Sequence, residues 1–240
     1  MTFDPFGDFE TQGYLRNLAK EKDTDIVRRL EHTSFTTGID AALERLAKVK
    51  HLSYPDVLET HRILFEAVYP WAGQDRLKTA PDLAISKGSI LFARPEDIER
   101  AVEFALTHGQ DKKFMAEKPG EIMGYLAYAH PFLDGNGRTI MVVHAVLAQR
   151  AGTSIDWAAT GKADYLSELT KELDNPGKGY LDAYLKQFIR GAVTDDRLAE
   201  EIVQAPGLDG NDEGNEVVGK TSDPTLKLRY EQQELKRRRR

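Results

Sequence analysis

The part of this chain that most constrains its fold is one short string, HPFLDGNGR at residues 130–138. It separates two apolar helical patterns, one that ends near Ala129 and one that begins near Arg138. Gly135 and Gly137 allow the main chain to take conformations that a side chain forbids, and to come close to a ligand. The helix that follows presents unpaired N–H groups and its positive dipole end. The string therefore predicts an anion site, of the kind that holds phosphate, between two buried helices.

Three side chains add chemistry to this predicted site. Asp134 supplies a hard oxygen ligand that suits Mg²⁺, the ion that accompanies nucleotide phosphates. His130 has an ordinary pKa close to neutral pH, which suits proton transfer, and Arg138 adds a cation. A plain connection between two helices explains any one of these residues, but it does not require all of them within nine positions.

The pattern resembles the Fic family, whose motif is commonly His-Pro-Phe-x-(Asp/Glu)-Gly-Asn-Gly-Arg-x-x-Arg. The string matches at every named position except the last, where this chain has Met141. Two further segments resemble the family: YPWAG at 69–73 with Arg76, before the family's flap, and ILFARPEDI at 90–98, at the flap's end. The resemblance covers about residues 50 to 190, and so long a motif is specific.

This resemblance implies a protein adenylyltransferase that acts as a bacterial toxin or effector. It would transfer AMP from ATP to a hydroxyl side chain of a target protein, with Mg²⁺ present. His130 would accept the hydroxyl proton, Asp134 would bind Mg²⁺, and Arg138 would balance charge on the departing pyrophosphate. Gly135, Asn136 and Gly137 would hold the α-phosphoryl oxygens. Phe132 would anchor the loop in the core.

Between Tyr69 and Arg94 the helical period is lost, and two short apolar runs flank Lys87-Gly88 like a β-hairpin. A surface hairpin is the simplest interpretation. In the Fic family the corresponding flap holds the target protein by main-chain pairing, for which an unpaired edge strand is suited. The residues predicted for this docking flap are Ile85, Ser86, Lys87, Gly88, Ser89, Ile90 and Leu91.

Met141 stands where the family's second arginine contacts terminal phosphates, and losing a charge-assisted contact costs about 1.5 to 3 kcal/mol. Four explanations remain open. In the first, Arg76, Arg94 or Lys87 replaces the missing cation. In the second, the nucleotide binds in another orientation and its γ-phosphoryl group is transferred, as in Doc-like relatives. In the third, the donor is not ATP, as in relatives that transfer phosphocholine; in the fourth, the enzyme is weak or inactive.

Inhibition in this family depends on a helix with the string (Ser/Thr)-x-x-x-Glu-(Gly/Asn). The chain has no such string, and its single Glu-Gly pair, Glu213-Gly214, lies in a stretch too rich in glycine for a helix. We therefore expect any antitoxin to be a separate chain.

The rest of the sequence is helical in pattern, so we expect an all-α fold: a Fic-type helical bundle with a small β-hairpin flap. Short amphipathic helices are predicted over 14–20, 24–31 and 38–49, with Ser53 capping the next helix. The motif helix, from about Asn136 to Ala151, is apolar almost all round, as expected for the central helix of a bundle. His61 and His144 are interpreted as core histidines.

His130 ends a helix, where the dipole favours the protonated imidazole. We therefore expect a modest upward shift of its pKa, and an activity that rises with pH through that value.

Composition limits the alternatives. A chain of 240 residues with 40% hydrophobic content is long enough for one sizeable core. It contains no cysteine, which excludes a disulfide framework and a thiolate nucleophile. No apolar run approaches the ~20 residues of a membrane span, and the acidic, aromatic N-terminus is unlike a secretory signal. We expect a cytoplasmic protein, or one delivered to a target cell by a leaderless secretion route.

The charge is uneven, because residues 225–240 carry seven Lys or Arg against two Glu although the whole chain has a net charge of −6. An acidic globular part argues against a broad nucleic-acid surface. We expect a Fic domain over 1–193, with a core at about 50–190 and a helical extension at 1–49. Residues 194–240 are expected to be a disordered tail, acidic and then basic. Its basic end is a candidate contact for nucleic acid or acidic surfaces.

Three classes of function therefore remain: a protein adenylyltransferase, an enzyme of the same fold that transfers another group (phosphoryl, another NMP or phosphocholine), and an interaction module without catalysis. The intact string from His130 to Arg138 favours the first, and Met141 favours the second.

Overall fold

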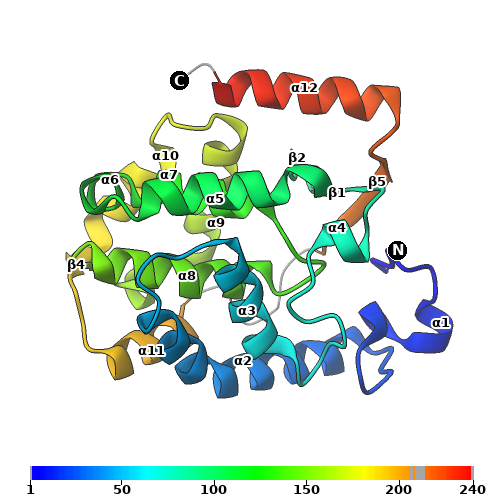
Figure 1. Cartoon of the computed structure of the whole chain (residues 1–240), viewed down its shortest axis with the longest axis horizontal. Coiled ribbons are helices and arrows are strands. Elements are labelled where there is room, and N and C mark those ends of the chain that lie inside the picture. The colour runs from blue at the N-terminus through cyan, green and yellow to red at the C-terminus, as the bar shows by residue number, and fades with distance from the viewer. Residues whose placement is uncertain (1, 206–207, 209–213, 239–240) are drawn as a thin grey trace.

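The protein is described by a computed structural model, which covers residues 2–205, 208 and 214–238. It is a helical bundle with two small antiparallel sheets (Figure 1). The helices are α1 (Phe9–Gln12), α2 (Thr24–Ala47), α3 (Tyr54–Phe65), α4 (Arg76–Thr79), α5 (Ile98–Gly109), α6 (Lys112–Glu117), α7 (Pro119–Ala129), α8 (Asn136–Arg150), α9 (Lys162–Asp174), α10 (Tyr180–Leu185), α11 (Asp195–Val203) and α12 (Pro224–Arg238). The strands are β1 (Leu83–Lys87), β2 (Ile90–Leu91), β3 (Thr153–Ile155), β4 (Ile189–Gly191) and β5 (Glu216–Lys220).

Helix α8 is the centre of the bundle. It contacts α7 on one side and α2 and α3 on the other (Figure 1). Every residue from Arg138 to Ala148 is buried, as the apolar pattern of the motif helix predicts. Because α7 ends at Ala129 and α8 begins at Asn136, the motif string comprises the short loop between two core helices and the first three residues of α8. Residues 130–135 are called the motif loop below.

The N-terminal part forms one long helix rather than two pieces. Helix α2 begins after Asp23, whose side chain accepts hydrogen bonds from the N–H groups of Asp25 and Ile26. It continues through Gly38, the residue at which the sequence pattern predicts the start of a separate helix. A Cβ at Gly38 would lie 2.8 Å from the carbonyl oxygen of Ile63, so this glycine allows α2 and α3 to approach closely and does not end the helix.

The predicted hairpin is present: β1 and β2 pair antiparallel, with Ser86 opposite Leu91 and Lys87 opposite Ile90. The sequence predicts an unpaired edge strand in the flap. In the structure, the other edge of β1 is instead paired antiparallel with β5. The strand order is therefore β2-β1-β5, which we call the flap sheet. The second sheet, β3 with β4, closes the far end of α8 and is absent from the sequence prediction.

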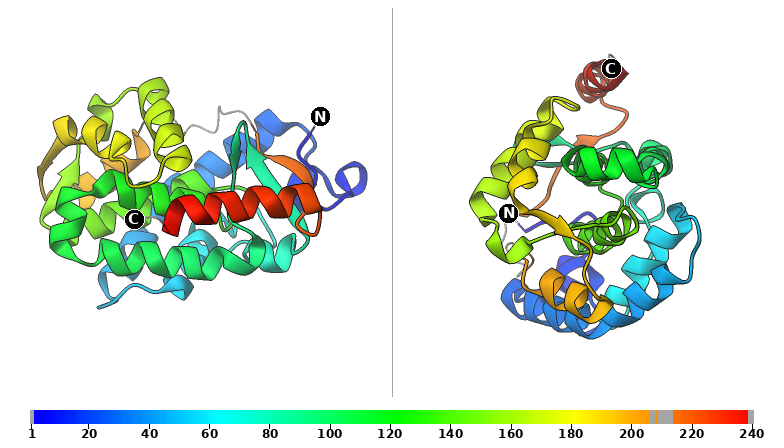
Figure 2. Two further views of the ribbon diagram at one scale, coloured as in Figure 1. Left: turned by 90° about the horizontal axis from the view of Figure 1, so that it is seen from above. Right: turned by 90° about the vertical axis from the view of Figure 1, so that its left-hand side faces the viewer.

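The prediction of a disordered tail after residue 193 requires correction in the described part. Helix α11 adds Leu198, Ala199 and Ile202 to the main core, so the packed domain extends beyond residue 193. Residues 216–238 form β5 and α12, and the red helix α12 lies along α5 in Figure 2. A few apolar residues are enough to hold α12 against the domain, because its Leu226 and Tyr230 pack on Ala84 and Leu91 of the flap sheet. Residues 206–207, 209–213 and 239–240 of the predicted tail lie outside the described residues.

No helix in the described ranges has the length and apolar character needed to cross a bilayer.

Close packing of α7 on α10 gives a first prediction. A Cβ at Gly120 would meet the main chain of Leu181 and Asp182 at 2.4 to 2.5 Å. Gly120→Ala should therefore lower the free energy of unfolding by about 1 to 3 kcal/mol, the usual effect of overpacking a core. The control is Gly191→Ala, whose new methyl group would meet nothing within 4 Å. Urea denaturation of both variants tests this, and equal stabilities would contradict the close contact.

Candidate active site

The motif loop holds an uncommon main-chain conformation at both ends. His130 has φ 41° and ψ 60°, in the left-handed region that non-glycine residues seldom occupy. Gly135 has φ 74°, and a Cβ there would lie 2.5 Å from the ring of Phe65, so only glycine fits. Left-handed residues of this kind are characteristic of functional sites, where the surrounding structure must hold them in place.

Two buried side chains bind the main chain of the motif loop from outside. The Arg76 Nε donates to the carbonyl oxygen of His130 at 2.7 Å, and its Nη2 donates to the carbonyl oxygen of Ala93, also at 2.7 Å. His61 accepts from the N–H of Gly73 through Nδ1 at 2.9 Å, so its proton is on Nε2, which lies 3.1 Å from the carbonyl oxygen of Asp134. The sequence-based interpretation of His61 as a core residue is confirmed.

Phe132 and His144 are also core residues, as predicted. Phe132 is fully buried, with its ring 3.7 Å from the ring of His61 and nearly parallel to it. His144 is buried on α8, and its Nε2 lies 2.8 Å from the carbonyl oxygen of Pro119. Burial lowers the pKa of His144 to about 4 and that of His61 to about 3, so both stay neutral and structural at physiological pH.

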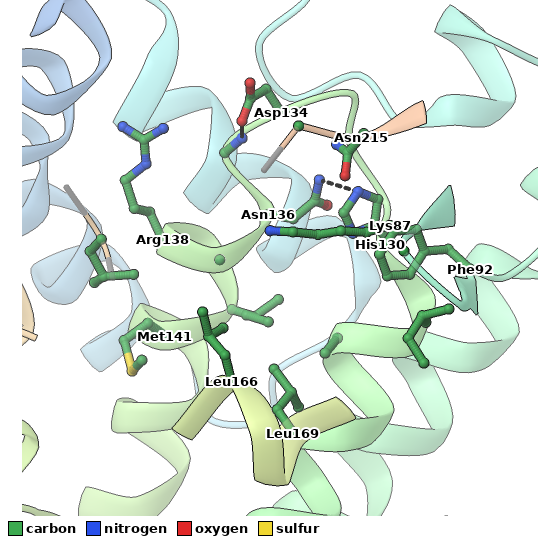
Figure 3. Close-up of a pocket in the computed structure, with 18 of the residues that line it drawn as sticks. Lys87, Phe92, His130, Asp134, Asn136, Arg138, Met141, Leu166, Leu169 and Asn215 are labelled. Carbon is green, nitrogen blue, oxygen red and sulfur yellow. Dashed lines mark hydrogen bonds between the residues drawn. The ribbon is translucent and has the colours of Figure 1, made fainter. Parts of the chain in front are cut away.

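Asn136 binds the motif loop from inside. Its side chain accepts from the N–H of Phe132 at 2.9 Å and donates to the carbonyl oxygen of the same residue at 2.8 Å. The same Nδ2 lies 3.2 Å from Nε2 of His130, a contact drawn as a dashed line in Figure 3. Since an amide nitrogen can only donate, Nε2 of His130 is the acceptor and carries the lone pair. Asn136 therefore fixes both the loop and the tautomer of the histidine.

His130 is held neutral. Its ring stacks on Phe92 with centroids 3.6 Å apart and planes 6° apart. Burial, and after it the positive charges of Arg76 and Lys87, keep the pKa of His130 well below its usual value. The modest upward shift expected from the helix dipole is therefore wrong, because desolvation and two cations outweigh one helix end.

A cavity of about 790 Å³ opens beside this histidine (Figure 3). Its polar side is formed by the motif loop and the start of α8, and its opposite wall is apolar and comes mainly from α8 and α9. The polar side includes His130, Asp134, Gly135, Asn136, Gly137 and Arg138, and the wall includes Ile140, Met141, Leu166, Leu169 and Leu173. The structure thus brings the predicted site residues of the motif to one cavity. Of the predicted flap residues, Lys87, Gly88, Ser89 and Ile90 line it as well, whereas Ile85, Ser86 and Leu91 do not.

Arg138 is not free in this cavity, because its Nη2 donates to Glu31 of α2 at 2.9 Å. Glu31 also accepts from the hydroxyl of Tyr69 at 2.6 Å. Burial and the nearby charge of Asp134 raise the pKa of Glu31 to about 7, and Arg138 only partly offsets them. The Nη1 of Arg138 is buried and has no hydrogen-bond partner within the described part of the chain, so one donor remains for an anion.

Asp134 occupies the opposite side of this charge cluster. Its Oδ1 accepts from the N–H of Gly135 at 2.7 Å, and its Oδ2 accepts from the hydroxyl of Tyr14 at 3.4 Å. Burial and the charges of Asp134 and Glu31 raise the pKa of this tyrosine far above its ordinary value, so Tyr14 remains a neutral donor.

The structure also shows which of the three cations proposed to replace the arginine missing at Met141 line the cavity. Met141 itself is 2% exposed, within the apolar wall. Arg76 is committed to the motif loop, and Arg94 pairs with Asp97 at 2.9 Å, so neither lines the cavity. Lys87 does line it.

Sequence reasoning missed several residues of the site. Arg28 and Glu31 reach the cavity from α2 at helical spacing, and Tyr14 and Asn215 reach it from segments far away in sequence. The sequence did contain a signal for Arg28 and Glu31, because two charged residues three positions apart lie on the same face of a helix. For Tyr14 and Asn215 no local pattern was available.

Comparisons with known proteins agree with this geometry. The Fic/DOC family profile matches residues 51–148. The protein named Probable protein adenylyltransferase y4lH, from Sinorhizobium fredii, is 30% identical over 151 residues, which are 59% of this chain and 74% of that protein. The chain belongs to the Fic/DOC family. The Protein adenylyltransferase VbhT of Bartonella schoenbuchensis is 32% identical over 162 residues, 64% of this Fic chain, which spans about a third of VbhT.

Solved structures show the same fold. BepC of Bartonella tribocorum, solved with bound AMPPNP, matches with a TM-score of 0.57 at 18% identity, covering 74% of this Fic chain and 92% of BepC. The N-terminal Fic domain of a VirB-translocated Bep effector from Bartonella quintana, solved with bound ADP, matches with a TM-score of 0.55 at 20% identity, covering 70% and 89%. The expected Fic-type helical bundle with a hairpin flap is thereby confirmed.

The neutral state of His130 can be tested directly. In NMR titrations of the imidazole nitrogens, His130 should remain neutral at pH 6, because its pKa is lowered. Lys87→Gln should move that pKa upward, since one of the two nearby cations is lost, while burial keeps it below the ordinary value. A wild-type pKa at or above 6.5 would show that the helix dipole dominates.

Proposed function

We propose that this Fic chain is a protein adenylyltransferase that transfers AMP from ATP to a hydroxyl side chain of a target protein. The observation that carries the proposal is a neutral histidine, His130, with the Nε2 lone pair oriented by Asn136 at the mouth of a cavity that begins at a helix N-terminus. Relatives named as adenylyltransferases, and Fic structures that hold ADP or AMPPNP, support it. We further propose that the chain acts as a toxin or effector, on the analogy of the Bep proteins.

In this proposal His130 is the general base. The target hydroxyl attacks the α-phosphorus of ATP, and its proton passes to Nε2 of His130. A base must be neutral to act, and the lowered pKa keeps it neutral throughout the physiological range.

The start of α8 supplies the anion site. The N–H groups of Asn136 and Gly137 stand at the positive end of a helix fifteen residues long, where phosphoryl oxygens are stabilised. The N–H of Gly135 donates to Asp134 in this structure, and it would have to leave that carboxylate to bind a phosphoryl oxygen. Arg138 adds charge on the side of the departing pyrophosphate, through the Nη1 that lacks a partner among the described residues.

Asp134 is the residue that would hold Mg²⁺. The described residues contain no cluster of three or more His, Asp or Glu suited to a metal, so the nucleotide would have to supply further ligands to the ion. This arrangement fits Mg²⁺, which is commonly bound by one or two carboxylates together with substrate phosphates. The ion would neutralise charge on the phosphates, and the hydroxyl of Tyr14 orients the carboxylate toward the cavity.

A second candidate function rests on Met141. Leucines of α9 share the apolar cavity wall with Met141, and the cations that line the same cavity are Arg28, Arg138 and Lys87 of the flap. Arg28 pairs with Asp25 at 3.0 Å and is a candidate replacement that the sequence analysis did not include. If none of these cations holds the terminal phosphates, the same fold would transfer another group: phosphoryl, another NMP or phosphocholine. A catalytically weak interaction module is the remaining alternative.

Partners other than the target are also proposals. A separate antitoxin chain would supply inhibition, since Glu213-Gly214 does not form the family's inhibitory string. Gly214 lines the cavity, and Glu213 lies outside the described residues. The basic end of α12 is a candidate contact for acidic surfaces. We propose that the chain works in the cytoplasm, of its own cell or of a target cell.

The proposed activity is tested by incubating the protein with cell lysate, Mg²⁺ and ATP labelled at the α- or the γ-phosphate. We expect label on lysate proteins from α-labelled ATP alone, and a loss of at least about a hundredfold in His130→Ala, which removes the general base. Thr37→Ala, an exposed change on α2, serves as the control. Label from γ-labelled ATP alone would indicate phosphotransfer, and label from neither would lead to trials with other nucleotides and CDP-choline.

Glu31 gives a further prediction. Glu31→Gln keeps hydrogen-bonding groups for Tyr69 and Arg138 but removes a negative charge close to the phosphate site. Because the pKa of Glu31 is raised to about 7, the carboxyl is mostly neutral at pH 6 and mostly ionised at pH 8. The variant should bind ATP about fivefold more tightly than the wild type at pH 8, since removing such a charge is worth about 1 kcal/mol, and almost equally at pH 6.

Calorimetric titration with ATP and Mg²⁺ at both pH values measures this difference. Glu44→Gln, on the exposed side of the same helix, is the matched control and should change neither value. Weaker ATP binding by Glu31→Gln at pH 8 would show that Glu31 serves only to position Arg138.

A further inference from the structure

The edge of β1 that faces away from β2 is filled by the chain itself. β5 pairs antiparallel with β1, with Leu83 opposite Lys220, Ala84 opposite Gly219, Ile85 opposite Val217, and Ser86 opposite Glu216. One residue of β5, Val218, is extra in this register and forms a bulge. Beyond the strand, the N–H of Thr221 donates to the carbonyl oxygen of Asp82 at 2.8 Å. The pairing thus runs along β1 from Leu83 to Ser86.

Main-chain pairing, rather than side-chain burial, holds β5 in place. Four of its five residues are exposed, including Val217 at 39% and Val218 at 38%. A strand attached in this way makes few demands on side-chain identity, which is the character of β-augmentation by an extended peptide. The edge of β1 is therefore able to accept other extended segments in the same direction.

The direction of β5 leads its preceding residues into the candidate active site. After Glu216 pairs with Ser86, the chain continues to Asn215 and Gly214, both of which line the cavity. Nδ2 of Asn215 donates to the carbonyl oxygen of Leu133 in the motif loop at 3.0 Å, and Figure 3 shows Asn215 where the flap sheet meets this loop. A non-reactive carboxamide therefore stands at the cavity mouth, on a strand held by the flap.

Helix α12 anchors this strand. Leu226 and Tyr230 are buried against Ala84 and Leu91 on the outer face of the flap sheet. The side chain of Gln233 donates to the carbonyl oxygen of Leu91 at 3.1 Å, and the guanidinium of Arg237 lies 3.5 Å from the ring centre of Tyr128 on α7. These contacts favour the paired state of β5 over its release.

We infer that residues 214–220 occupy the edge on which an acceptor protein docks, and that Asn215 marks the position of the acceptor's hydroxyl residue. The segment is a built-in pseudosubstrate: it binds as an extended acceptor would, but its carboxamide cannot accept the nucleotidyl group. The partner that this surface fits is an extended protein segment, antiparallel to β1, with Ser, Thr or Tyr at the position of Asn215. This inference rests on the proposed adenylyltransferase activity.

The inference predicts that one substitution converts the pseudosubstrate into a substrate. In Asn215→Ser the new hydroxyl oxygen would form a bond to the α-phosphorus of ATP, and the bond from that phosphorus to the bridging oxygen of the β-phosphate would break. Pyrophosphate leaves with the electron pair of the broken bond, and the hydroxyl proton passes to His130. We expect label from α-labelled ATP at residue 215, located by mass spectrometry.

Three controls make this test specific. Val218→Ser places the same hydroxyl at an exposed bulge position on the same strand and should be labelled at least tenfold more slowly. Asn215→Ser combined with His130→Ala should not be labelled. The rate per chain should be independent of protein concentration, because the acceptor and the site belong to one molecule. Equal labelling at 215 and 218, or a rate per chain that rises with concentration, would overturn the inference.

Failure of the inference and failure of the proposed function are distinguishable. If the wild type labels lysate proteins while neither Asn215→Ser nor Asn215→Thr labels itself at residue 215, the inference alone is overturned. If lysate proteins and both variants all stay unlabelled, the adenylyltransferase proposal fails, and the inference falls with it.

A second measurement tests the anchor. The acceptor is a synthetic peptide of residues 212–220 that carries Asn215→Ser, added to the full chain with α-labelled ATP and Mg²⁺. Tyr230→Asp should label this peptide at least fivefold faster than the wild type, because it releases β5 from the edge. Leu228→Asp, at a position 54% exposed on the same helix, should behave as the wild type. Equal rates for the wild type and Tyr230→Asp would show that β5 does not compete with an acceptor.

Discussion

The motif loop keeps its shape because buried side chains take up its main-chain polar groups. Arg76 binds the carbonyl oxygen of His130, His61 lies against that of Asp134, and Asn136 binds both polar groups of Phe132. A loop with left-handed residues stores strain and has unsatisfied groups unless its surroundings satisfy them. The three side chains that satisfy the loop come from α3, α4 and α8. Because the other core elements surround α8, much of the bundle helps to hold the loop in its conformation.

The same arrangement concentrates charge in a small volume. Two carboxylates, Asp134 and Glu31, flank one buried guanidinium, and the hydroxyls of Tyr14 and Tyr69 donate to them. Tyrosines suit this position because burial and nearby carboxylates raise their pKa, so they remain donors. An arriving phosphate competes with Glu31 for Arg138. In the proposed function, the strength of nucleotide binding would therefore depend on a residue of α2, outside the family motif.

Local patterns in the sequence were sufficient for the motif and for the helices around it. Periodicity placed α8 and its burial, and the Gly-rich string placed the loop, because both depend on residues close together in the chain. The pKa of His130 was predicted in the wrong direction, because burial and the charges of Arg76 and Lys87 arise from tertiary packing. Gly38 was predicted as the start of a separate helix, although it lies inside α2 where that helix contacts α3. The tail was taken as disordered from its composition, yet pairing with β1 and two apolar anchors order the part that the structure describes.

The contact between Trp71 and the N-terminal segment makes this tryptophan useful for fluorescence spectroscopy. The indole of Trp71 donates to the carbonyl oxygen of Leu15 at 2.7 Å, and its ring stacks on Tyr69 with centroids 4.4 Å apart. Tyr69 in turn donates to Glu31, the partner of Arg138. The chain's other tryptophan, Trp157, lies near His144, away from this cluster. Trp71 is thus a native fluorophore three contacts from the motif arginine, and Trp157 provides an internal reference for emission changes when a ligand enters.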